Sequence, residues 1–245
     1  MENFYIIADL KVRMKTFGRT ELQARPYLCE PFDIEDFAID SSTVENLGMI
    51  PVDDYFKEVS HDLREYMISG MLFYKNLLNH QGMMLHSSCI VVDGKAYLFT
   101  ADSGTGKSTH TNLWLNMFGD RAYILNDDKP ALRLVDGVWY AYGTPWSGKN
   151  DISVNTRIPV AGIACLERGE NNEIERFCGA NAIQAIMKQV NRPRKSEYRV
   201  KLLNLLNELM TRVPVWKLKC NMDPEAAIVS YEAMSGQKFT KEIKL

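Results

Sequence analysis

Apolar and polar residues alternate over residues 4–14, and this pattern predicts a β-strand. Residues 15–58 are acidic and show no regular period, so we expect an irregular segment that completes a small N-terminal β-rich portion. From Val59 to about Asn79 the apolar residues recur at helical spacing, which predicts a helix that packs on a core. We therefore divide the chain into a β-rich portion, residues 1–58, and a larger domain, residues 59–245.

Two Asp-Gly pairs each separate two apolar runs. Asp93-Gly94 follows the run 84–92, and Asp136-Gly137 follows the run 131–135. Both central residues of a tight hairpin turn need positive φ, so Asp-Gly between such runs predicts a β-hairpin. Further strands are predicted over residues 160–166 and 213–219, and helices over residues 180–190, 197–210 and from Asp223-Pro224 to Gly236. Since hairpins outnumber strand-helix-strand units, we predict an α/β fold with a mixed β-sheet.

A glycine-rich segment lies between the strand that ends at Thr100 and an amphipathic helix. It matches the P-loop (Walker A) pattern, except that Ala101 holds the first glycine position. Glycines let the backbone wrap around phosphates, and a helix N-terminus adds a positive dipole end. The alternative is a strand-to-helix turn that binds nothing. We predict nucleotide binding by Ser103, Gly104, Thr105, Gly106, Lys107, Ser108 and Thr109, with the Lys107 ammonium on the β- and γ-phosphates and the Ser108 hydroxyl on Mg²⁺.

Two adjacent carboxylates, Asp127 and Asp128, follow the apolar run 122–125. A strand that ends in carboxylates near a P-loop can place one of them on Mg²⁺ and let the other take a proton. Two carboxylates that face phosphates disfavour double ionisation, which raises the pKa of one of them toward that of a useful base. The alternative is an Asx-rich turn that leads into Lys129-Pro130.

Three segments, residues 85–92, 102–108 and 125–128, resemble the catalytic core of HPr kinase/phosphorylase. The resemblance covers residues 84–166 and implies a nucleotide-binding fold of the phosphoenolpyruvate carboxykinase-like type. It further implies that Lys107 binds phosphate, that Ser108 and Asp128 hold Mg²⁺, that Asp127 is the base and that His86 lies close to the transferred phosphoryl group. Without the resemblance, a lone histidine in an apolar strand is more often a core residue.

The sequence departs from that family in two regions. The segment 142–149 has no carboxylate where the family has a glutamate. Its end, Trp146 to Lys149, forms either a loop over the site, with Lys149 as a second cation, or a surface turn. A basic segment occupies roughly the place of the family's mobile loop. This segment contains Arg192, Arg194 and Lys195. Its cations either stabilise the transferred phosphoryl group or bind an acidic acceptor, or the segment is a solvated turn.

Composition excludes several classes of protein. The 29 Lys and Arg residues against 31 Asp and Glu give a net charge of −2, so we expect no nucleic-acid partner. No apolar run approaches the roughly 18 residues of a membrane span, so we expect no membrane partner. The five cysteines are scattered without a Cys-x-x-Cys pair, which argues against a disulfide framework and a zinc site. We therefore expect a cytoplasmic protein.

The sequence as a whole predicts an ATP-dependent, Mg²⁺-requiring kinase that phosphorylates a hydroxyl. The chain resembles the stand-alone, serine-kinase-like branch of the HPr kinase family, which implies ATP as the nucleotide and a serine acceptor, free or in a peptide or protein. HPr kinases are oligomers, so a homo-oligomer is implied as well. Two alternatives stay open: a non-catalytic ATP-binding switch or assembly factor, and a carboxykinase-like enzyme acting on a small acid.

Overall fold

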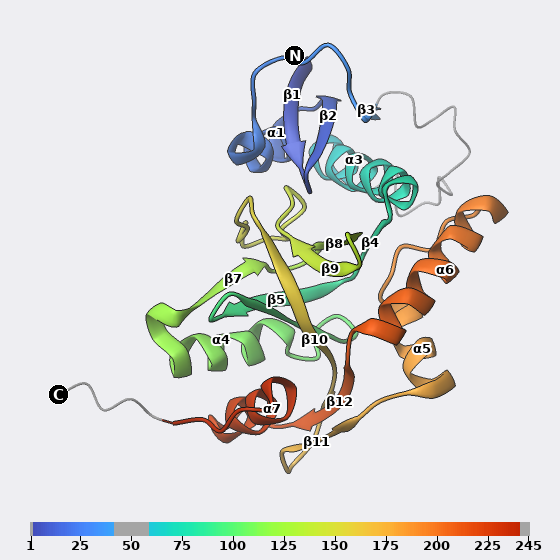
Figure 1. Ribbon diagram of the computed structural model, residues 1–245. Coiled ribbons are helices and arrows are strands. Elements are labelled where there is room, and N and C mark those ends of the chain that lie inside the picture. The colour runs from blue at the N-terminus through green and yellow to red at the C-terminus, as the bar shows by residue number, and fades with distance from the viewer. Residues whose placement is uncertain (1, 42–58, 241–245) are drawn as a thin grey trace.

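The computed structural model describes residues 2–41 and 59–240 (Figure 1). Its helices are α1 (Gly18–Ala24), α3 (His61–Leu77), α4 (Lys107–Phe118), α5 (Gly179–Lys188), α6 (Ser196–Arg212) and α7 (Glu225–Ser235), with short 3-10 turns at η1 (Arg25–Tyr27), η3 (Leu78–His80) and η4 (Gly119–Arg121). Its strands are β1 (Glu2–Ile7), β2 (Leu10–Lys15), β3 (Phe37–Asp40), β4 (Gly82–Met84), β5 (Ser87–Val92), β6 (Lys95–Thr100), β7 (Ala122–Asn126), β8 (Ala131–Val135), β9 (Val138–Tyr142), β10 (Arg157–Arg168), β11 (Glu173–Arg176) and β12 (Val215–Cys220).

The N-terminal residues form a three-stranded sheet in the order β1-β2-β3. The prediction of one strand over residues 4–14 is wrong, because Ala8 and Asp9 adopt φ values of 53° and 58° and turn the chain into the β1-β2 hairpin. The prediction that residues 15–58 are irregular is also wrong for the part that the structure describes, which contains α1 and β3. Residues 42–58 lie outside the described part.

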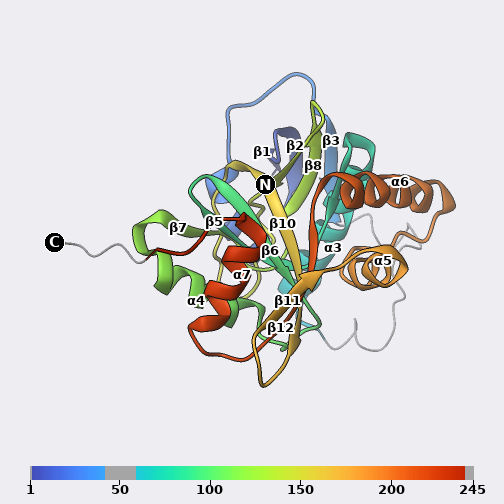
Figure 2. The ribbon, with the colours of Figure 1, turned by 60° about the horizontal axis from the view of Figure 1, so that its bottom comes forward.

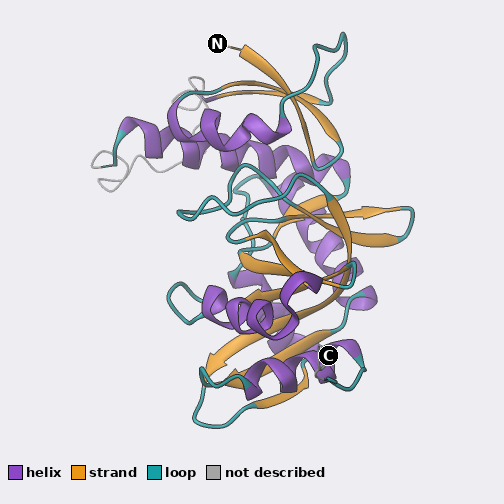
Figure 3. Cartoon of the chain, turned by 90° about the vertical axis from the view of Figure 1, so that its left-hand side faces the viewer, coloured by secondary structure: helices purple, strands orange, loops and turns teal. Residues whose placement is uncertain are grey.

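Helix α3 packs against this small sheet, as Figure 3 shows at the end of the molecule that carries the N-terminus. The helix was predicted from its periodicity, and the structure confirms it; the Ser60 hydroxyl caps it by accepting a hydrogen bond from the Leu63 N–H at 3.2 Å. Phe73 and Leu77 share one hydrophobic cluster with Ile7 of β1. The division of the chain at residue 58 stays a prediction, and α3 contributes to the same core as the strands before that boundary.

The larger sheet has nine strands in the order β4-β8-β9-β10-β6-β5-β7, with β12 paired to β10 and β11. Strand β10 runs parallel to β6 and β12, whereas the remaining pairs are antiparallel, so the predicted mixed sheet is confirmed. The long β10 makes the sheet curl, because its first residues pair with β9 and its later residues with β6 and β12.

Both predicted hairpins are present. Asp93-Gly94 joins β5 to β6 and Asp136-Gly137 joins β8 to β9, and all four residues have positive φ. The run 84–92 is not one strand, however, because β4 pairs with β8 while β5 pairs with β6 and β7. Leu85 and His86 link these two strands. The short β11 was not predicted.

Helices cover both faces of the central strands (Figure 2). Helices α4 and α7 pack on one face, against Ile90 and Phe99. Helices α5 and α6 pack on the opposite face, against Val91 and Leu98. Strands β5 and β6 are therefore buried on both sides, which explains why they read as nearly continuous apolar runs. None of the described helices has the length and apolar character needed to cross a membrane.

Several chain segments meet at one edge of this sheet. Strands β6, β7, β10 and β12 end there, because β5 runs antiparallel to β6 and β7 while β10 is parallel to β6 and β12. Strand β5 begins at the same edge, where Ser87 pairs with Thr100. Strands β5 and β7 lie on one side of β6, and β10 and β12 lie on the other. The functional residues predicted from the sequence lie at this edge.

Candidate functional site

The loop between β6 and α4 is built around two glycines. Gly104 and Gly106 have φ values of 78° and 123°, which strain any residue with a side chain. The Thr105 N–H donates to the Asp102 carbonyl at 3.2 Å and closes a turn. From the end of β10, the Arg168 guanidinium donates to the Gly104 carbonyl at 2.6 Å and to the Thr105 carbonyl at 3.3 Å. Arg168 therefore ties the loop to the neighbouring strand.

The loop leaves hydrogen-bond donors free at the start of α4. Within the part of the chain that the structure describes, no hydrogen bond uses the backbone N–H of Gly104, Gly106 or Lys107. Unpaired N–H groups at the N-terminus of a helix attract anions, and α4 is 12 residues long. This end of α4 can therefore hold an anion.

The Lys107 ammonium lies back over the loop, where it donates to the carbonyl of the buried Ala101 at 3.0 Å. Burial lowers the pKa of Lys107, and nearby carboxylates, that of Asp128 foremost, oppose this shift. An anionic ligand at the loop would reinforce the charged form of Lys107. The lysine is thus placed to add a positive charge to the free N–H groups.

Asp127 follows β7 and faces two hydroxyl groups. Its Oδ1 accepts hydrogen bonds from Ser88 Oγ at 2.6 Å and from Ser108 Oγ at 3.0 Å. Its Oδ2 accepts one long bond, 3.4 Å, from Asn150 Nδ2. The first oxygen is therefore fixed by β5 and α4, while the second has one weak contact among the described residues.

A buried asparagine shapes the turn that carries both carboxylates. The Asn126 side chain has 0% exposure, and its Oδ1 accepts hydrogen bonds from the backbone N–H of Asp128 at 3.1 Å and of Lys129 at 2.8 Å. This is the Asx turn that the sequence offered as an alternative. The turn and a functional role do not exclude each other, because the turn presents the two carboxylates at the sheet edge.

Asp128 is paired with two basic side chains. Its Oδ1 lies 3.3 Å from His86 Nε2, and its Oδ2 accepts a hydrogen bond from the Lys129 ammonium. Burial raises the pKa of Asp128, but His86 and Lys129 outweigh burial and hold that pKa below its ordinary value. His86 is fixed on its other side, where Nδ1 lies 3.2 Å from Gln189 Oε1. Gln189 in turn donates to Asp102 Oδ1 at 2.9 Å.

An open cleft of about 650 Å³ unites most of the predicted residues. The predicted site residues that line it are His86, Ser103, Gly104, Gly106, Lys107, Ser108, Thr109, Asp127 and Asp128. Thr105 does not line this cleft but faces a second pocket on the other side of the loop. Arg19 of α1 and Tyr66 of α3 also line the cleft, and neither was predicted.

The segment from Trp146 to Lys149 is one wall of the cleft rather than a surface turn. Trp146 has 0% exposure and stacks on Phe73 with ring centroids 4.8 Å apart. The Gly148 carbonyl accepts hydrogen bonds from the Arg19 guanidinium and from Gln23 Nε2. Of the two alternatives, the loop over the site is therefore the one observed, and Lys149 lines the cleft.

The basic segment before α6 lies elsewhere. Its cations line a separate small groove against α3 and Tyr198; they are Arg192, Arg194 and Lys195. They are not among the residues that line the cleft. Gln189, just before the segment, does reach His86. The structure therefore brings the start of this connection to the site, but not its charges.

A family model described as "SynChlorMet cassette protein ScmC" matches residues 57–225. The chain belongs to this family. No curated protein matches the chain. Among solved structures, the Hpr(Ser) kinase/phosphatase from Coxiella burnetii is similar at 12% sequence identity, with a TM-score of 0.37 over 62% of this chain and 95% of that chain.

The residues matched by the ScmC family include the loop, both carboxylates, His86 and Gln189. Arg19 lies outside the matched range, although it lines the cleft. Besides Arg19 and Tyr66, three residues that contribute hydrogen bonds to the site in this ScmC-family chain were missed from the sequence: Ser88, Arg168 and Gln189. Ser88 had one available signal, since it lies within the apolar run that pairs with the strand entering the loop.

The oxygen atoms beside α4 fit a magnesium ion. Octahedral Mg²⁺ with ligand distances of about 2.1 Å places neighbouring ligand oxygens about 3 Å apart. Ser108 Oγ and Asp127 Oδ1 are 3.0 Å apart, so they match such a pair. Both oxygens of Asp128 face basic side chains, so this carboxylate fits the ion less well. The described residues contain no cluster of three or more His, Cys, Asp or Glu side chains that could hold a metal on its own.

Proposed function

We propose that this protein is an ATP-dependent kinase that transfers the γ-phosphate of Mg-ATP to a hydroxyl group, that of serine in a free amino acid, a peptide or a protein. The observation that carries the proposal is the position of Asp127. Its Oδ1 is fixed by two hydroxyls, and its Oδ2 is weakly engaged in the cleft that also contains Lys107 and the loop. A fixed carboxylate with one available oxygen suits a general base.

In this proposal the loop binds the phosphates. The free N–H groups of Gly104, Gly106 and Lys107, together with the Lys107 ammonium, hold the β- and γ-phosphates. Ser108 Oγ and Asp127 Oδ1 would hold Mg²⁺, which neutralises phosphate charge that otherwise repels the incoming hydroxyl. The departing ADP keeps these contacts, so the same donors stabilise the charge that develops on it.

Transfer then needs one proton acceptor. The acceptor oxygen forms a bond to the γ-phosphorus, the bond from that phosphorus to the β-γ bridging oxygen breaks, and the hydroxyl proton moves to Asp127 Oδ2. Asp128 holds the Lys129 ammonium at the cleft, where the other N–H groups of Lys129 can donate hydrogen bonds to the phosphoryl oxygens. Both ring nitrogens of His86 are engaged, by Asp128 and by Gln189, so His86 orients Asp128 beside the phosphates. Positioning and electrostatic stabilisation supply most of the rate in such reactions.

The test is the transfer of labelled phosphate from Mg-ATP to free serine, to serine-containing peptides and to protein acceptors. We expect Asp127→Asn to lower transfer by about 100-fold or more, since general-base catalysis contributes roughly that much. Mg-ATP binding should persist, because the amide keeps an oxygen that can face the ion and the loop and Lys107 still hold the phosphates. The matched control is Asp120→Asn, which changes an exposed aspartate outside the cleft and should leave transfer unchanged.

Two results would count against the kinase. One is an Asp127→Asn variant that transfers phosphate as fast as the parent. The other is a parent protein that binds Mg-ATP but phosphorylates no hydroxyl acceptor; that result would favour the ATP-binding switch that the sequence left open.

A further inference from the structure

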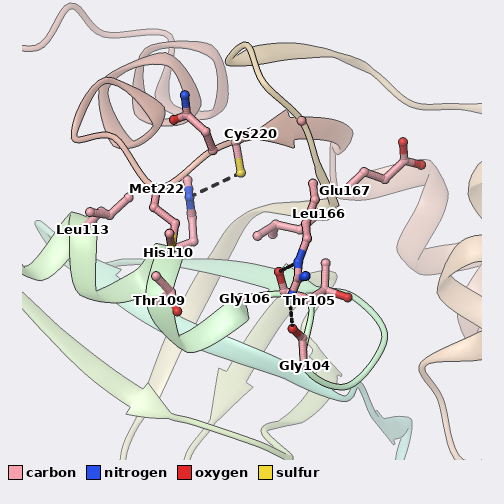
Figure 4. Close-up of a pocket in the computed structure, with 13 residues that line it drawn as sticks. Gly104, Thr105, Gly106, Thr109, His110, Leu113, Leu166, Glu167, Cys220 and Met222 are labelled. Carbon is pink, nitrogen blue, oxygen red and sulfur yellow. Dashed lines mark hydrogen bonds between the residues drawn. The ribbon is translucent and has the colours of Figure 1, made fainter.

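A second pocket lies on the other side of the loop from the carboxylates, which do not line it. Figure 4 shows the residues that line this pocket. Its volume is about 450 Å³. Leu113 of α4, Leu166 of β10 and Met222 after β12 give it apolar walls, and the backbone from Gly104 to Gly106 lies along one side. The pocket is thus an apolar cavity that opens directly onto the proposed phosphate-binding loop.

The loop separates this pocket from the cleft. Gly104, Gly106 and Thr109 line both cavities. Lys107, Ser108 and the two aspartates line only the cleft, whereas Leu113, Leu166 and Met222 line only the pocket. One ligand could therefore extend across the loop, with its charged part in the cleft and an apolar part in the pocket.

The strand order gives this arrangement a direction. The loop follows β6; the carboxylates follow β7, two strands away on one side, and Met222 follows β12, two strands away on the other. Neighbouring strands are about 4.8 Å apart, so the carboxylates and Met222 each lie roughly 10 Å from the loop, in opposite directions along the sheet. The reacting end of a bound nucleotide would point toward β7, and its other end toward β12.

We infer that the pocket between α4, β10 and β12 binds the nucleobase and sugar of the nucleotide whose phosphates lie on the loop. This inference rests on the proposed function. The flat faces of a nucleobase are largely apolar, and apolar walls suit them. The rim carboxylate of Glu167, which pairs with Lys217 at 3.1 Å, disfavours a phosphate in this pocket and can accept a hydrogen bond from a sugar hydroxyl.

Three polar side chains around the pocket, those of His110, Asn221 and Arg168, are already engaged within the protein. The His110 ring bonds to Ser230 Oγ at 3.0 Å through Nε2. Through Nδ1 it contacts Cys220 Sγ at 3.9 Å (Figure 4). The Asn221 amide donates to the Glu170 carbonyl and to Asp223. The surface that remains for a ligand is therefore mainly apolar, which favours contact with the ring faces over recognition of the base edges.

The experiment compares two ligands that differ only in the nucleoside: Mg-ATP and magnesium tripolyphosphate, with Kd values measured by titration calorimetry. The test variant is Leu113→Gln, which makes one wall of the pocket polar. The matched control is Leu115→Gln, which changes the same residue type on the same helix against the same hydrophobic cluster but outside the pocket. Lys107→Ala reports on the loop itself.

We expect Leu113→Gln to raise the Kd for Mg-ATP at least tenfold and to change the Kd for tripolyphosphate less than twofold. Leu115→Gln should change neither value, and Lys107→Ala should raise both. Met222→Ser, a change of an exposed side chain, should reproduce the ATP-selective loss even if Leu113→Gln fails to fold.

The inference is overturned if folded Leu113→Gln and Met222→Ser bind Mg-ATP with the Kd of the parent. It is also overturned if they raise the Kd values for Mg-ATP and tripolyphosphate by the same factor. In either case, weaker binding of both Mg-ATP and tripolyphosphate by Lys107→Ala would still support the loop as the phosphate site. A parent protein that binds neither ligand would overturn the proposed function and this inference together.

Discussion

The site around Asp127 is built by side chains that lie far from it in the sequence. Ser88 reaches it from the neighbouring strand, and Arg19 and Gln189 shape the same cleft from α1 and from the end of α5. The loop and the carboxylate pair could be predicted, because each is a contiguous segment at the end of a strand. Arg19 and Gln189 could not, because tertiary packing alone brings them to the site. Ser88 had only the signal that it lies in the apolar run that pairs with the strand entering the loop.

The short bond from Ser88 to Asp127 predicts a positioning role. Within the proposed function, we expect Ser88→Ala to lower kcat about tenfold with little change in KM for ATP, because Asp127 loses one of the two hydroxyls that orient it. Ser87→Ala is the matched control, since Ser87 is equally buried but donates to the Leu85 carbonyl. Steady-state kinetics give kcat and KM for the two variants. An equal fall of kcat in both would contradict the positioning role of Ser88.

Glu65 gives stability a dependence on pH. Its burial in α3 raises its pKa to about 7, although hydroxyls including that of Thr20 oppose the shift. Because the folded pKa lies above the ordinary value near 4.5, the free energy of unfolding falls as pH rises from about 4.5 to 7 and then levels off. We expect the free energy of unfolding of Glu65→Gln to equal that of the parent near pH 4.5 and to be larger by roughly 3 kcal/mol above pH 7.

Urea unfolding at several pH values measures this difference. Glu197→Gln, a change of an exposed glutamate in the first turn of α6, is the control and should show no such trend. A difference between Glu65→Gln and the parent that does not vary with pH would contradict the prediction.

At the scale of elements, local chemistry explains which predictions succeeded. The Asp93-Gly94 and Asp136-Gly137 turns carry residues that accept positive φ, so both hairpins were visible in the sequence. The β1-β2 turn has the same backbone form, but its residues are Ala8 and Asp9. Alanine is not a turn signal, and the apolar alternation continues through this pair, so the sequence read as one strand. The short β11 depends on pairing with β12 rather than on its own pattern.

The contact between α3 and the cleft wall fixes one helix position as glycine. A Cβ atom on Gly70 would lie 2.8 Å from Trp146 Cδ1. Helix propensity alone predicts that Gly70→Ala stabilises α3 by about 0.5–1 kcal/mol, whereas overpacking a core costs about 1–3 kcal/mol. We expect overpacking to dominate, so that the variant melts below the parent and displaces Trp146. Thermal melts followed by tryptophan fluorescence test this, and an equal or higher Tm would contradict it.

At the scale of the whole molecule, the N-terminal strands and the site share one framework. The cluster that joins β1 and β2 to α3 also contains Trp146, whose loop carries Gly148 and Lys149 into the cleft. From α1, Arg19 donates to the Gly148 carbonyl. The sequence separated residues 1–58 from the rest because the apolar pattern changes there, and no local pattern can reveal that α3 completes its core with strands from the other side of that boundary.

This shared core predicts that the full chain unfolds as a unit. Ile7 in β1 has 0% exposure, so Ile7→Ala should lower stability by about 3 kcal/mol, the usual cost of such a cavity. If the strands and the cleft unfold together, the variant shows one calorimetric transition, shifted downward by roughly 6–12 °C for a chain of this size. Leu22→Ala, at a position with 55% exposure, is the control and should shift the transition little. Two transitions, of which Ile7→Ala moves one, would show instead that the N-terminal strands unfold independently, and the cleft would then keep its ligand affinity while β1 and β2 are unfolded.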